Sequence, residues 1–406
     1  MDVLIVGGGG REHALAWKIA QSSHLRDLHA APGNPGIERI GRCHPVRADD
    51  PEAVLSLSRE LAVDLVVVGP EAPLVAGLAD ALRGVGVAVF GPTAAAARIE
   101  GSKSFAKDVL RSAGVPTAAE LNDPRAPCVV KADGLAAGKG VFVCHTEAEL
   151  ARAVPRVREL GERVVLEELL EGEEVSLFAL CDGTDALPLA PAQDFKRLLD
   201  GDRGPNTGGM GSYSPVPWLS GDRVEELVEM VHRPVLRELA ARGTPFRGLL
   251  YAGLMLTEDG PNVLEFNCRF GDPETQAILP RLEGDLLEAL AAVAEGSLEG
   301  IDLVAGREAA VTVVLAAAGY PEAPETGIEI VGVGDAEAES TLVFHAGTAL
   351  RGGSLVSAGG RVLNVTGLGE SVAEARERAY RAVEHVGPAE LQYRHDIALA
   401  AVHANA

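Results

Sequence analysis

The stretch VVKADGLAAGKGV at residues 129–141 decides the fold of this chain. An apolar run ends at Lys131, a loop of small residues with three glycines and Lys139 follows, and a second apolar run comes after it. Small residues allow such a loop to fold closely over a polyphosphate, whose charge the two lysines would neutralise. It is not the G-x-x-x-x-G-K-[ST] loop, because no Ser or Thr follows Lys139. The stretch predicts a strand–loop–strand unit that binds phosphates, with Gly138 and Gly140 in the loop; a hairpin without a ligand is the alternative.

A second informative stretch is VLEFNCRFGDPE at residues 263–274. On a strand, Glu265, Asn267 and Arg269 alternate onto one face, and the residues between them take the other face. A carboxylate and an amide oxygen suit Mg²⁺ or Mn²⁺, and a guanidinium suits an anion. The stretch predicts a metal and anion site, since these groups would be costly if left unused on a buried strand. The alternative is an exposed edge strand. Cys268 is expected to be a buried core thiol.

The acidic stretch EELLEGEE at residues 167–174 has two interpretations. A solvated acidic turn is the first. In the second, an extended hinge pairs its backbone with an adenine edge through Glu167, Glu168 and Leu170, and Glu174 meets the ribose hydroxyls. The stretch alone does not decide between them.

The N-terminal run GGGGREH lies between an expected strand and an expected helix. Backbone N–H groups of such a loop close on an anion, helped by the helix N-terminus; a tight turn is the alternative. A dinucleotide site is excluded, because Glu12 or His13 stands where the third glycine of G-x-G-x-x-G belongs, and no acidic residue ends the second strand. The candidates for binding a phosphate are Gly8, Gly9 and Gly10.

Residues 192–211, AQDFKRLLDGDRGPNTGGMG, combine a polar strand end with a glycine-rich loop. We interpret residues 204–211 as an ordered substrate loop and not as a flexible linker, because Pro205 restricts the backbone and polar side chains follow it. The candidate residues are Asp194, Lys196, Asn206, Thr207, Gly208 and Gly209.

Lysine is rare in this chain, at 6 of the 36 basic residues. Arginine serves wherever a generic cation suffices, so a retained lysine marks a place where a compact ammonium on a flexible stem is needed. On this basis Lys103, at the start of an expected helix, joins Lys131, Lys139 and Lys196 as a candidate; chance is the alternative.

Composition restricts the partners. The formal net charge of −23 argues against nucleic acid, because phosphate-backbone binding needs clustered cations. No apolar run approaches the roughly 20 residues of a membrane span, and no basic region precedes an apolar stretch at the N-terminus. We therefore expect a cytoplasmic protein without a membrane partner. Five scattered cysteines argue against disulfides and structural zinc, and a monomer is expected.

The first hundred residues alternate short apolar runs with helical patterns. Strands are expected at residues 2–6, 64–68 and 87–90, with helices at 12–19 and 73–82. Such alternation implies βαβ units and a doubly wound parallel sheet.

Later segments predict two further domains. Strands at residues 128–131 and 141–144 flank the glycine loop, while 249–256 and 262–266 read as an antiparallel pair. Beyond about residue 305 the pattern is strand-rich and ends in a helix, as in a small α+β domain. The expected fold is a multidomain α/β and α+β protein with domains at residues 1–100, 101–305 and 306–406.

Together these motifs resemble one known family. KADGLAAGKGV, DFKR, GPNTGGMG, EFNCRFGDPE and GGGGREHA are similar to the motifs of glycinamide ribonucleotide synthetases, in the family's order and over nearly the whole chain. RFGDPE is typical of this family within the ATP-grasp superfamily. Two departures stand out: residues 118–127 are shorter than the family usually shows, and Ala398 stands where a glycine is expected.

The resemblance implies an N-terminal doubly wound domain, a central ATP-grasp domain with a mobile lid near residues 115–181, and a C-terminal domain. The implied reaction joins glycine to 5-phosphoribosylamine through a glycyl phosphate, with ATP and Mg²⁺ or Mn²⁺, and gives glycinamide ribonucleotide, ADP and phosphate in purine synthesis. Lys103 and Lys131 would contact the phosphates, and Glu265 and Asn267 would hold the metal. The implied catalytic residues are Lys131, Asp194 and Arg269, and Asp272 and Arg269 would contact substrate.

Two other functions stay open at this point. Another ATP-grasp ligase, or a carboxylase, could use the same nucleotide site. A regulator that binds ATP or a phosphosugar without chemistry is disfavoured by the full set of Lys131, Glu265, Asn267 and Arg269.

Overall fold

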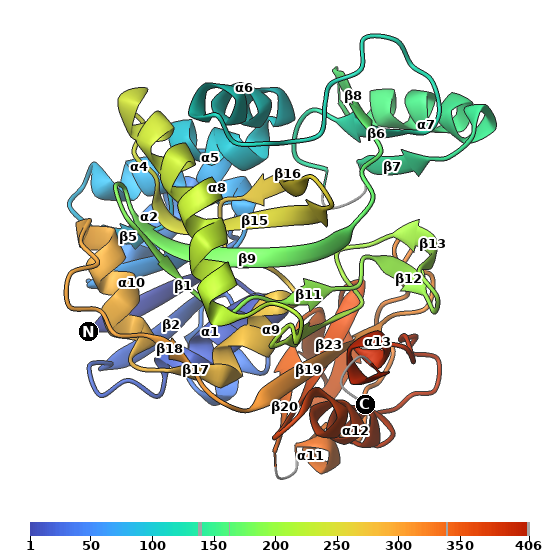
Figure 1. The fold of residues 1–406 in the computed structure, drawn as a ribbon. Helices are drawn as coiled ribbons and strands as arrows, with labels where there is room; N and C mark the ends of the chain where they lie inside the picture. The colour runs from blue at the N-terminus through green and yellow to red at the C-terminus, as the bar shows by residue number, and fades with distance from the viewer. Residues whose placement is uncertain (137–139, 162, 338–339, 404–406) are drawn as a thin grey trace.

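The structure is a computed structural model that describes residues 1–136, 140–161, 163–337 and 340–403. Four units are visible in Figure 1: an N-terminal sheet, a central sheet, a small projecting unit and a C-terminal sheet. The predicted combination of a parallel N-terminal sheet with mixed α/β units is confirmed.

The N-terminal sheet has five strands in the order β3-β2-β1-β4-β5, all paired in parallel. Alternate residues of β1 enter two different apolar cores: Leu4 lies in one and Ile5 in the other. Both faces of the sheet are therefore covered, which explains why the central strands are continuously apolar. The strands are β1 (Asp2–Gly7), β2 (Asp27–Pro32), β3 (Arg42–Cys43), β4 (Leu65–Val68) and β5 (Ala88–Phe90).

One predicted helix of this unit is wrong. Residues 73–82 were expected to form a single helix, but α3 (Glu71–Val75) and α4 (Leu78–Arg83) are separate. Gly77 lies between them with a φ of +90°, a left-handed conformation that glycine adopts readily and that interrupts a right-handed helix. The apolar spacing continues across this break, so periodicity alone could not reveal it.

The central unit is a four-stranded antiparallel sheet in the order β10-β9-β15-β16, with β10 at Ala186–Pro188. The predicted antiparallel pair is confirmed as β15 (Arg247–Thr257) and β16 (Gly260–Asn267). β9 (Glu173–Asp182) pairs with β15, and the long helix α8 (Gly221–Ala241) lies across these strands (Figure 1).

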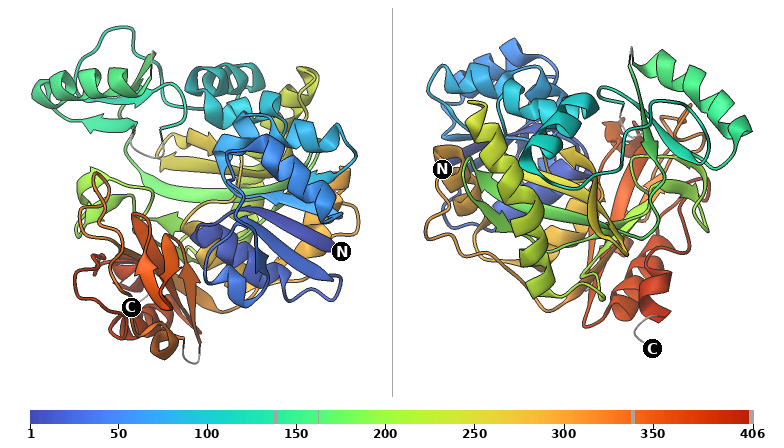
Figure 2. Two further views of the ribbon diagram at one scale, coloured as in Figure 1. Left: turned by 180° about the vertical axis from the view of Figure 1, so that it is seen from behind. Right: turned by 45° about the horizontal axis from the view of Figure 1, so that its top comes forward.

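A small unit carries the glycine loop and projects from the rest of the molecule in every view (Figures 1 and 2). β6 (Cys128–Ala132) pairs with β7 (Val141–Cys144) and with β8 (Val164–Glu168). Helix α7 (Glu147–Leu160) packs on these strands around a separate apolar core. Both strands predicted around the loop are confirmed, and these four elements lie within the lid predicted near residues 115–181.

The C-terminal sheet combines strands from two distant parts of the chain. Its order is β11-β14-β19-β23-β20, with every pairing antiparallel. β19 (Ala309–Ala316), β20 (Thr341–His345) and β23 (Arg361–Gly369) come from the end of the chain, whereas β11 (Gln193–Asp194) and β14 (Gly211–Ser214) precede it by about a hundred residues. The connection between β11 and β14 is therefore anchored to this sheet at both ends.

Ala398 has a φ of +60° and is fully buried in the C-terminal core. This left-handed region favours glycine, because a Cβ crowds the following carbonyl. The glycine expected at this position thus has a conformational reason.

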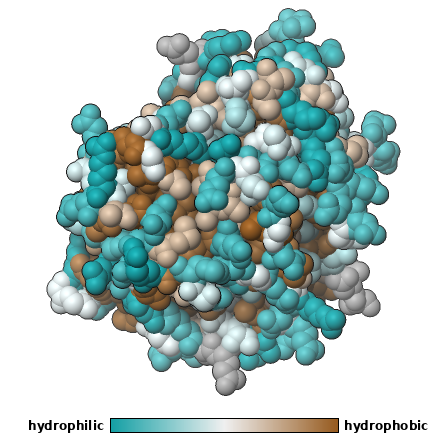
Figure 3. Space-filling model, turned by 90° about the vertical axis from the view of Figure 1, so that its left-hand side faces the viewer, coloured by the Kyte–Doolittle hydropathy of each residue, from teal (hydrophilic) through white to brown (hydrophobic). Residues whose placement is uncertain are grey.

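The face of the molecule drawn in Figure 3 is mostly hydrophilic, with apolar patches interrupted by polar side chains. Among the described residues, no helix has both the length and the apolar character that crossing a bilayer requires.

Gly367 in β23 lets helix α12 (Val372–Val383) approach the C-terminal sheet closely. A Cβ at this position would lie 2.2 Å from the Ala375 carbonyl oxygen and 2.5 Å from the Ala379 nitrogen. We predict that Gly367→Ala lowers the free energy of unfolding by about 1–3 kcal/mol, as overpacking does. Urea denaturation measures it. Gly334→Ala is the control, because a Cβ there would meet no atom within 4 Å apart from its own helix and chain neighbours, and an equal loss in both variants would contradict the explanation.

Candidate active site

A cavity of about 1090 Å³ lies where the lid, the central sheet and the C-terminal sheet meet. Its walls include Gly134 and Gly140 from the glycine loop, Glu265 from β16 and Arg361 from β23. Lys103, the first residue of helix α6 (Lys103–Ala113), also lines the cavity, and its ammonium donates to the Gly134 carbonyl of the glycine loop at 3.2 Å. The glycine loop and the acidic strand therefore face one another across a single cavity.

The predicted alternation is met in part: β16 is an edge strand that ends at Asn267, and Leu264 and Phe266, expected on the other face, also border the cavity. Glu265, Asn267 and Arg269 line the cavity, and the side chain of Glu265 is 33% exposed. Phe266 and Cys268 are buried in the core, and Cys268 is a free thiol as expected. Burial raises the pKa of Cys268 well above its ordinary value, so it stays a neutral thiol.

The Asn267 amide is oriented by Glu100, a residue that the sequence did not indicate. With its nitrogen turned toward helix α5 (Ala94–Gly101), Asn267 donates to Glu100 Oε1 at 3.0 Å. The amide oxygen then points the opposite way. Together with the Glu265 carboxylate it provides the hard oxygen donors that Mg²⁺ or Mn²⁺ prefers, so these residues fit a divalent cation.

Arg269 is held by two carboxylates. Its Nε lies 3.2 Å from Glu71 and its Nη2 lies 3.2 Å from Glu100, while Nη1 donates to the Phe270 carbonyl. Burial opposes ionisation of Glu71, but Arg269 and Arg11 lower its pKa to about 2. Burial raises the pKa of Glu100. The side chain of Arg269 is 17% exposed and borders the cavity with its nitrogens already engaged.

Glu167 joins the lid to helix α6. Its side chain, 3% exposed, forms ion pairs with Lys107 at 2.9 Å and with Lys131 at 2.6 Å. Lys131 also donates to the Leu264 carbonyl at 2.9 Å and so reaches β16. Sequence reasoning gave Glu167 only a hinge role and gave Lys107 none, although the rarity of lysine was a usable signal.

The other predicted nucleotide contacts fall into two groups. Gly138 and Lys139 lie outside the described residues. The other five residues all line the cavity, namely Lys103, Gly140, Glu168, Leu170 and Glu174.

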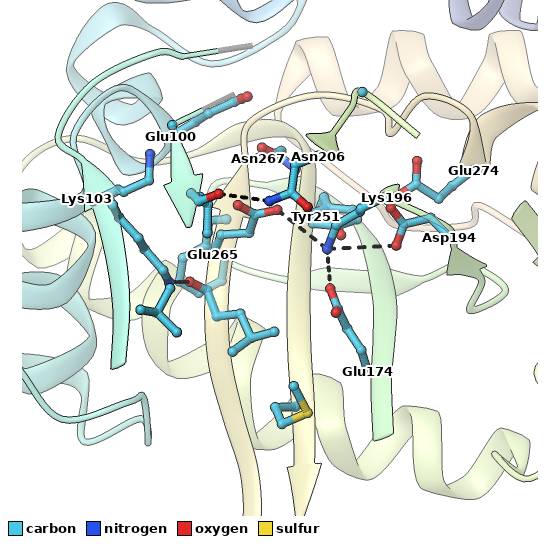
Figure 4. A pocket seen from close by; sticks show the side chains of 18 of the residues that line it. Glu100, Lys103, Glu174, Asp194, Lys196, Asn206, Tyr251, Glu265, Asn267 and Glu274 are labelled. Carbon is cyan, nitrogen blue, oxygen red and sulfur yellow. Dashed lines mark hydrogen bonds and ion pairs between the residues drawn. The ribbon is translucent and has the colours of Figure 1, made fainter. Parts of the chain in front are cut away.

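Lys196 lies among carboxylates in the wall of the cavity (Figure 4). Its ammonium forms an ion pair with Glu174 and lies 3.8 Å from Asp194 and 4.0 Å from Glu265. Burial raises the pKa of Asp194 to about 8; Lys196 opposes this shift, and the nearby Glu274 adds to it. Asp194 is therefore a carboxyl group that can exchange a proton near neutral pH.

Glu274 and Tyr251 extend this cluster, and the sequence did not single them out. Burial raises the pKa of Glu274, whose Oε1 lies 3.5 Å from the Ser176 hydroxyl. The same hydroxyl lies 3.1 Å from that of Tyr251. Glu274 ends the RFGDPE motif, which was the available signal, whereas β15 places Tyr251 here only by its pairing with β9.

The predicted substrate loop begins in a strand: β13 (Arg203–Asn206) pairs with β12 (Arg197–Leu199), and the segment after it contacts its surroundings. The Asn206 amide donates to the Val141 carbonyl of lid strand β7 at 2.8 Å. The Thr207 hydroxyl donates to the Lys196 carbonyl at 2.9 Å, and the Gly209 N–H donates to that hydroxyl at 3.0 Å. Asn206, Thr207 and Gly208 line the cavity, as does Asp272.

Gly8, Gly9 and Gly10 are not among the described residues that line the cavity. Gly9 is the N-cap residue of helix α1 (Gly10–Ile19), and its N–H donates to the Glu12 carboxylate at 2.6 Å. A Cβ on Gly9 would lie 3.7 Å from an Asp272 oxygen, so the loop lies close to one wall of the cavity. Phosphate binding by these glycines stays a prediction.

Comparison with known proteins covers nearly the whole chain. Models of the phosphoribosylglycinamide synthetase family match its N domain at residues 1–100, its ATP-grasp (A) domain at 101–275 and its C domain at 310–400. The chain belongs to this family. The resemblance inferred from the motifs is thereby confirmed.

Full-length relatives of this synthetase family agree. The chain is 51% identical to phosphoribosylamine–glycine ligase of Rhizobium meliloti (strain 1021), covering 99% of each protein. It is 53% identical to phosphoribosylamine–glycine ligase of Streptomyces coelicolor, covering 98% of this chain and 99% of that one. The predicted class, an ATP-dependent ligase, is confirmed.

Solved structures similar to this chain include a member of the same family and more distant proteins that share the fold. The crystal structure of phosphoribosylamine–glycine ligase from Thermotoga maritima has a TM-score of 0.83 and 36% identity, covering 98% of this chain and 100% of that one. The biotin carboxylase domain of Hydrogenobacter thermophilus 2-oxoglutarate carboxylase has a TM-score of 0.70 and 17% identity, covering 95% and 90%. The second likeness shows a shared fold alone.

The buried ion pairs of Glu167 give a prediction about stability. Glu167→Gln would leave the Lys107 and Lys131 ammoniums buried against a neutral amide, and it should lower the free energy of unfolding by about 3 kcal/mol. Urea denaturation measures the change. Glu168→Gln is the matched control, because the neighbouring carboxylate is exposed. Equal stability of the two variants would show that the pairs contribute nothing.

Proposed function

We propose that this chain joins glycine to 5-phosphoribosylamine with ATP, giving glycinamide ribonucleotide, ADP and phosphate in de novo purine synthesis. One observation carries the proposal: the glycine loop, Lys103, Lys131 and the oxygen pair of Glu265 and Asn267 border one cavity. The substrates are taken from the relatives at about 50% identity that are named phosphoribosylamine–glycine ligase.

ATP would occupy the cavity between the lid and β16. The backbone of the hinge at residues 167–170 would meet adenine, because the Glu167 side chain is engaged with lysines. Glu265 and Asn267 would hold Mg²⁺ or Mn²⁺, which when bound neutralises charge on the phosphates. The proposed contacts to phosphates and ribose are Lys103, Lys131, Gly138, Lys139, Gly140 and Glu174.

Activation comes first because a carboxylate is a poor electrophile. The glycine carboxylate attacks the γ-phosphorus, ADP leaves, and glycyl phosphate forms. Lys103 and Lys131 orient the phosphates for this transfer, which depends on positioning and charge more than on covalent help. Closure of the glycine loop then excludes water, which would hydrolyse the acyl phosphate.

Amide formation follows. The ribosylamine nitrogen attacks the glycyl carbonyl, the C–N bond forms, phosphate leaves, and the nitrogen gives up a proton. Asp194 is the proposed acceptor of that proton, because its pKa is raised toward the operating pH. Arg269 is the proposed cation near the developing oxyanion.

The remaining assignments stay proposals. The ribosylamine phosphate would lie at Gly8, Gly9 and Gly10, and the other substrate contacts are Lys196, Asn206, Thr207, Gly208, Gly209 and Asp272. We propose the division into domains at residues 1–100, 101–305 and 306–406, with a lid segment near 115–181, and a cytoplasmic monomer whose five cysteines are free thiols.

The proposed reaction predicts which substrates ADP release requires. ADP should accumulate rapidly only when ATP, a divalent cation, glycine and the ribosylamine are all present, and one glycinamide ribonucleotide should form for each ADP. A coupled ADP assay with each component omitted in turn tests this. Release driven by bicarbonate in place of glycine would instead indicate a carboxylase, which shares the fold. Binding of ATP with no turnover would indicate a regulator.

The same assay tests the metal role through a variant. Glu265→Ala should lower turnover by at least about 10²-fold, because an oxygen ligand for the cation is lost. Glu258→Ala, on the exposed turn of the same hairpin, is the control. Normal turnover by Glu265→Ala would refute the metal assignment.

Ionisation of Asp194 predicts a pH dependence. Because its folded pKa is raised and only the ionised form accepts a proton, kcat/KM for the ribosylamine should rise from pH 6 toward a plateau above about pH 8. Asp194→Asn should lack this rise and lose about 10²–10⁴-fold in rate. The exposed Asp259→Asn is the control. An unaltered pH profile in Asp194→Asn would exclude Asp194 as the base.

A further inference from the structure

Both backbone polar groups of Gly208, in the substrate loop, are held by side chains of the C-terminal domain. Its N–H donates to the Tyr320 hydroxyl at 3.0 Å, and its carbonyl accepts from Arg361 Nη1 at 2.6 Å. Tyr320 follows β19, and Arg361 begins β23. A residue more than a hundred positions earlier in the chain is thus fixed by these two side chains.

Arg361 also connects the loop to the RFGDPE motif. Nη1 donates to the Asp272 carbonyl at 2.7 Å, and Nη2 lies 3.2 Å from the Asp272 carboxylate. A Cβ on Gly208 would lie 3.1 Å from the Arg361 guanidinium carbon, and one on Gly209 would lie 2.4 Å from Pro273. The two glycines therefore fit between Arg361 and the 272–273 peptide unit with no space for a side chain.

The other contacts of the substrate loop are with the lid and with the segment that carries Lys196. Asn206 donates to the lid at the Val141 carbonyl, and Thr207 donates to the carbonyl of Lys196, whose ammonium lies among Glu174 and the other carboxylates. Three consecutive residues, 206 to 208, thus contact the lid, the lysine cluster and the C-terminal domain. A shift of the peptide at 208 would move both polar side chains that precede it.

We infer that Arg361 and Tyr320 are positioning residues for the ligation, which act through the backbone N–H and carbonyl of Gly208. They fix the substrate loop so that Asn206 meets the lid and Thr207 orients the segment that carries Lys196. The guanidinium of Arg361 is suited to this task, because a planar fork can serve two carbonyl oxygens and a carboxylate together. This inference rests on the proposed ligase function.

The test compares Arg361→Lys, Tyr320→Phe and the double variant in the full-length protein, measuring ADP and glycinamide ribonucleotide separately. Arg361→Lys should lower kcat/KM for the ribosylamine about tenfold or more, and Tyr320→Phe about threefold, with KM for ATP unchanged. ADP formed should exceed product, because glycyl phosphate is hydrolysed when the displaced loop no longer positions the ribosylamine to attack it. The double variant should match Arg361→Lys alone, since both changes act through the backbone of the same residue, Gly208.

Arg351→Lys is the control, because this exposed arginine belongs to the same domain and lies outside the residues lining the cavity. Additive losses in the double variant, or a Tyr320→Phe enzyme with normal constants, would overturn the inference and assign any effect of Arg361 to direct substrate contact. Tyr320→Phe alone decides the matter if Arg361→Lys does not fold, as judged by its melting temperature. Wild-type protein that forms no product would instead refute the proposed function.

Discussion

The buried carboxylate of Glu167 is the interaction on which the rest of this site depends. It neutralises Lys107 of helix α6 and Lys131 of lid strand β6, all three side chains being at most 7% exposed. Lys131 then donates to the Leu264 carbonyl, next to Glu265, the proposed metal ligand. The Glu167 carboxylate therefore connects lid strand β6 to helix α6 and, through Lys131, to strand β16. A lysine held in this way meets the phosphates of a nucleotide without losing much conformational freedom.

Two other cations of the cavity each lie close to more than one carboxylate. Arg269 lies between Glu71 and Glu100, and the ammonium of Lys196 lies close to Glu174 and Asp194. Buried ions left unpaired would cost several kcal/mol each. The pairing also keeps each cation in place before any substrate arrives, so that the geometry of the site is largely set by the protein alone.

Local chemistry on single strands could be predicted from the sequence, whereas contacts between distant segments could not. That Glu265 and Asn267 both line the cavity follows from the period of a strand. Glu100 and Arg361 reach the same cavity from helix α5 and strand β23, and no local pattern marks either one. The break at Gly77 was missed for the opposite reason, because the apolar spacing of a helix continued across a residue whose backbone cannot continue it.

The C-terminal sheet crosses the domain boundary proposed at residue 306, because it also contains the earlier strands β11 and β14. β11 carries Asp194 and pairs with β14, which pairs with β19, so the catalytic candidate and the substrate loop belong to the sheet of the C-terminal domain. The proposed ATP, in contrast, would lie between the lid and β16. Because strand pairing is rigid over these short distances and the lid has its own separate core, movement is expected at the contact of Asn206 with Val141 and not within the sheet. We therefore propose that the C-terminal domain is the fixed frame for any movement of the lid.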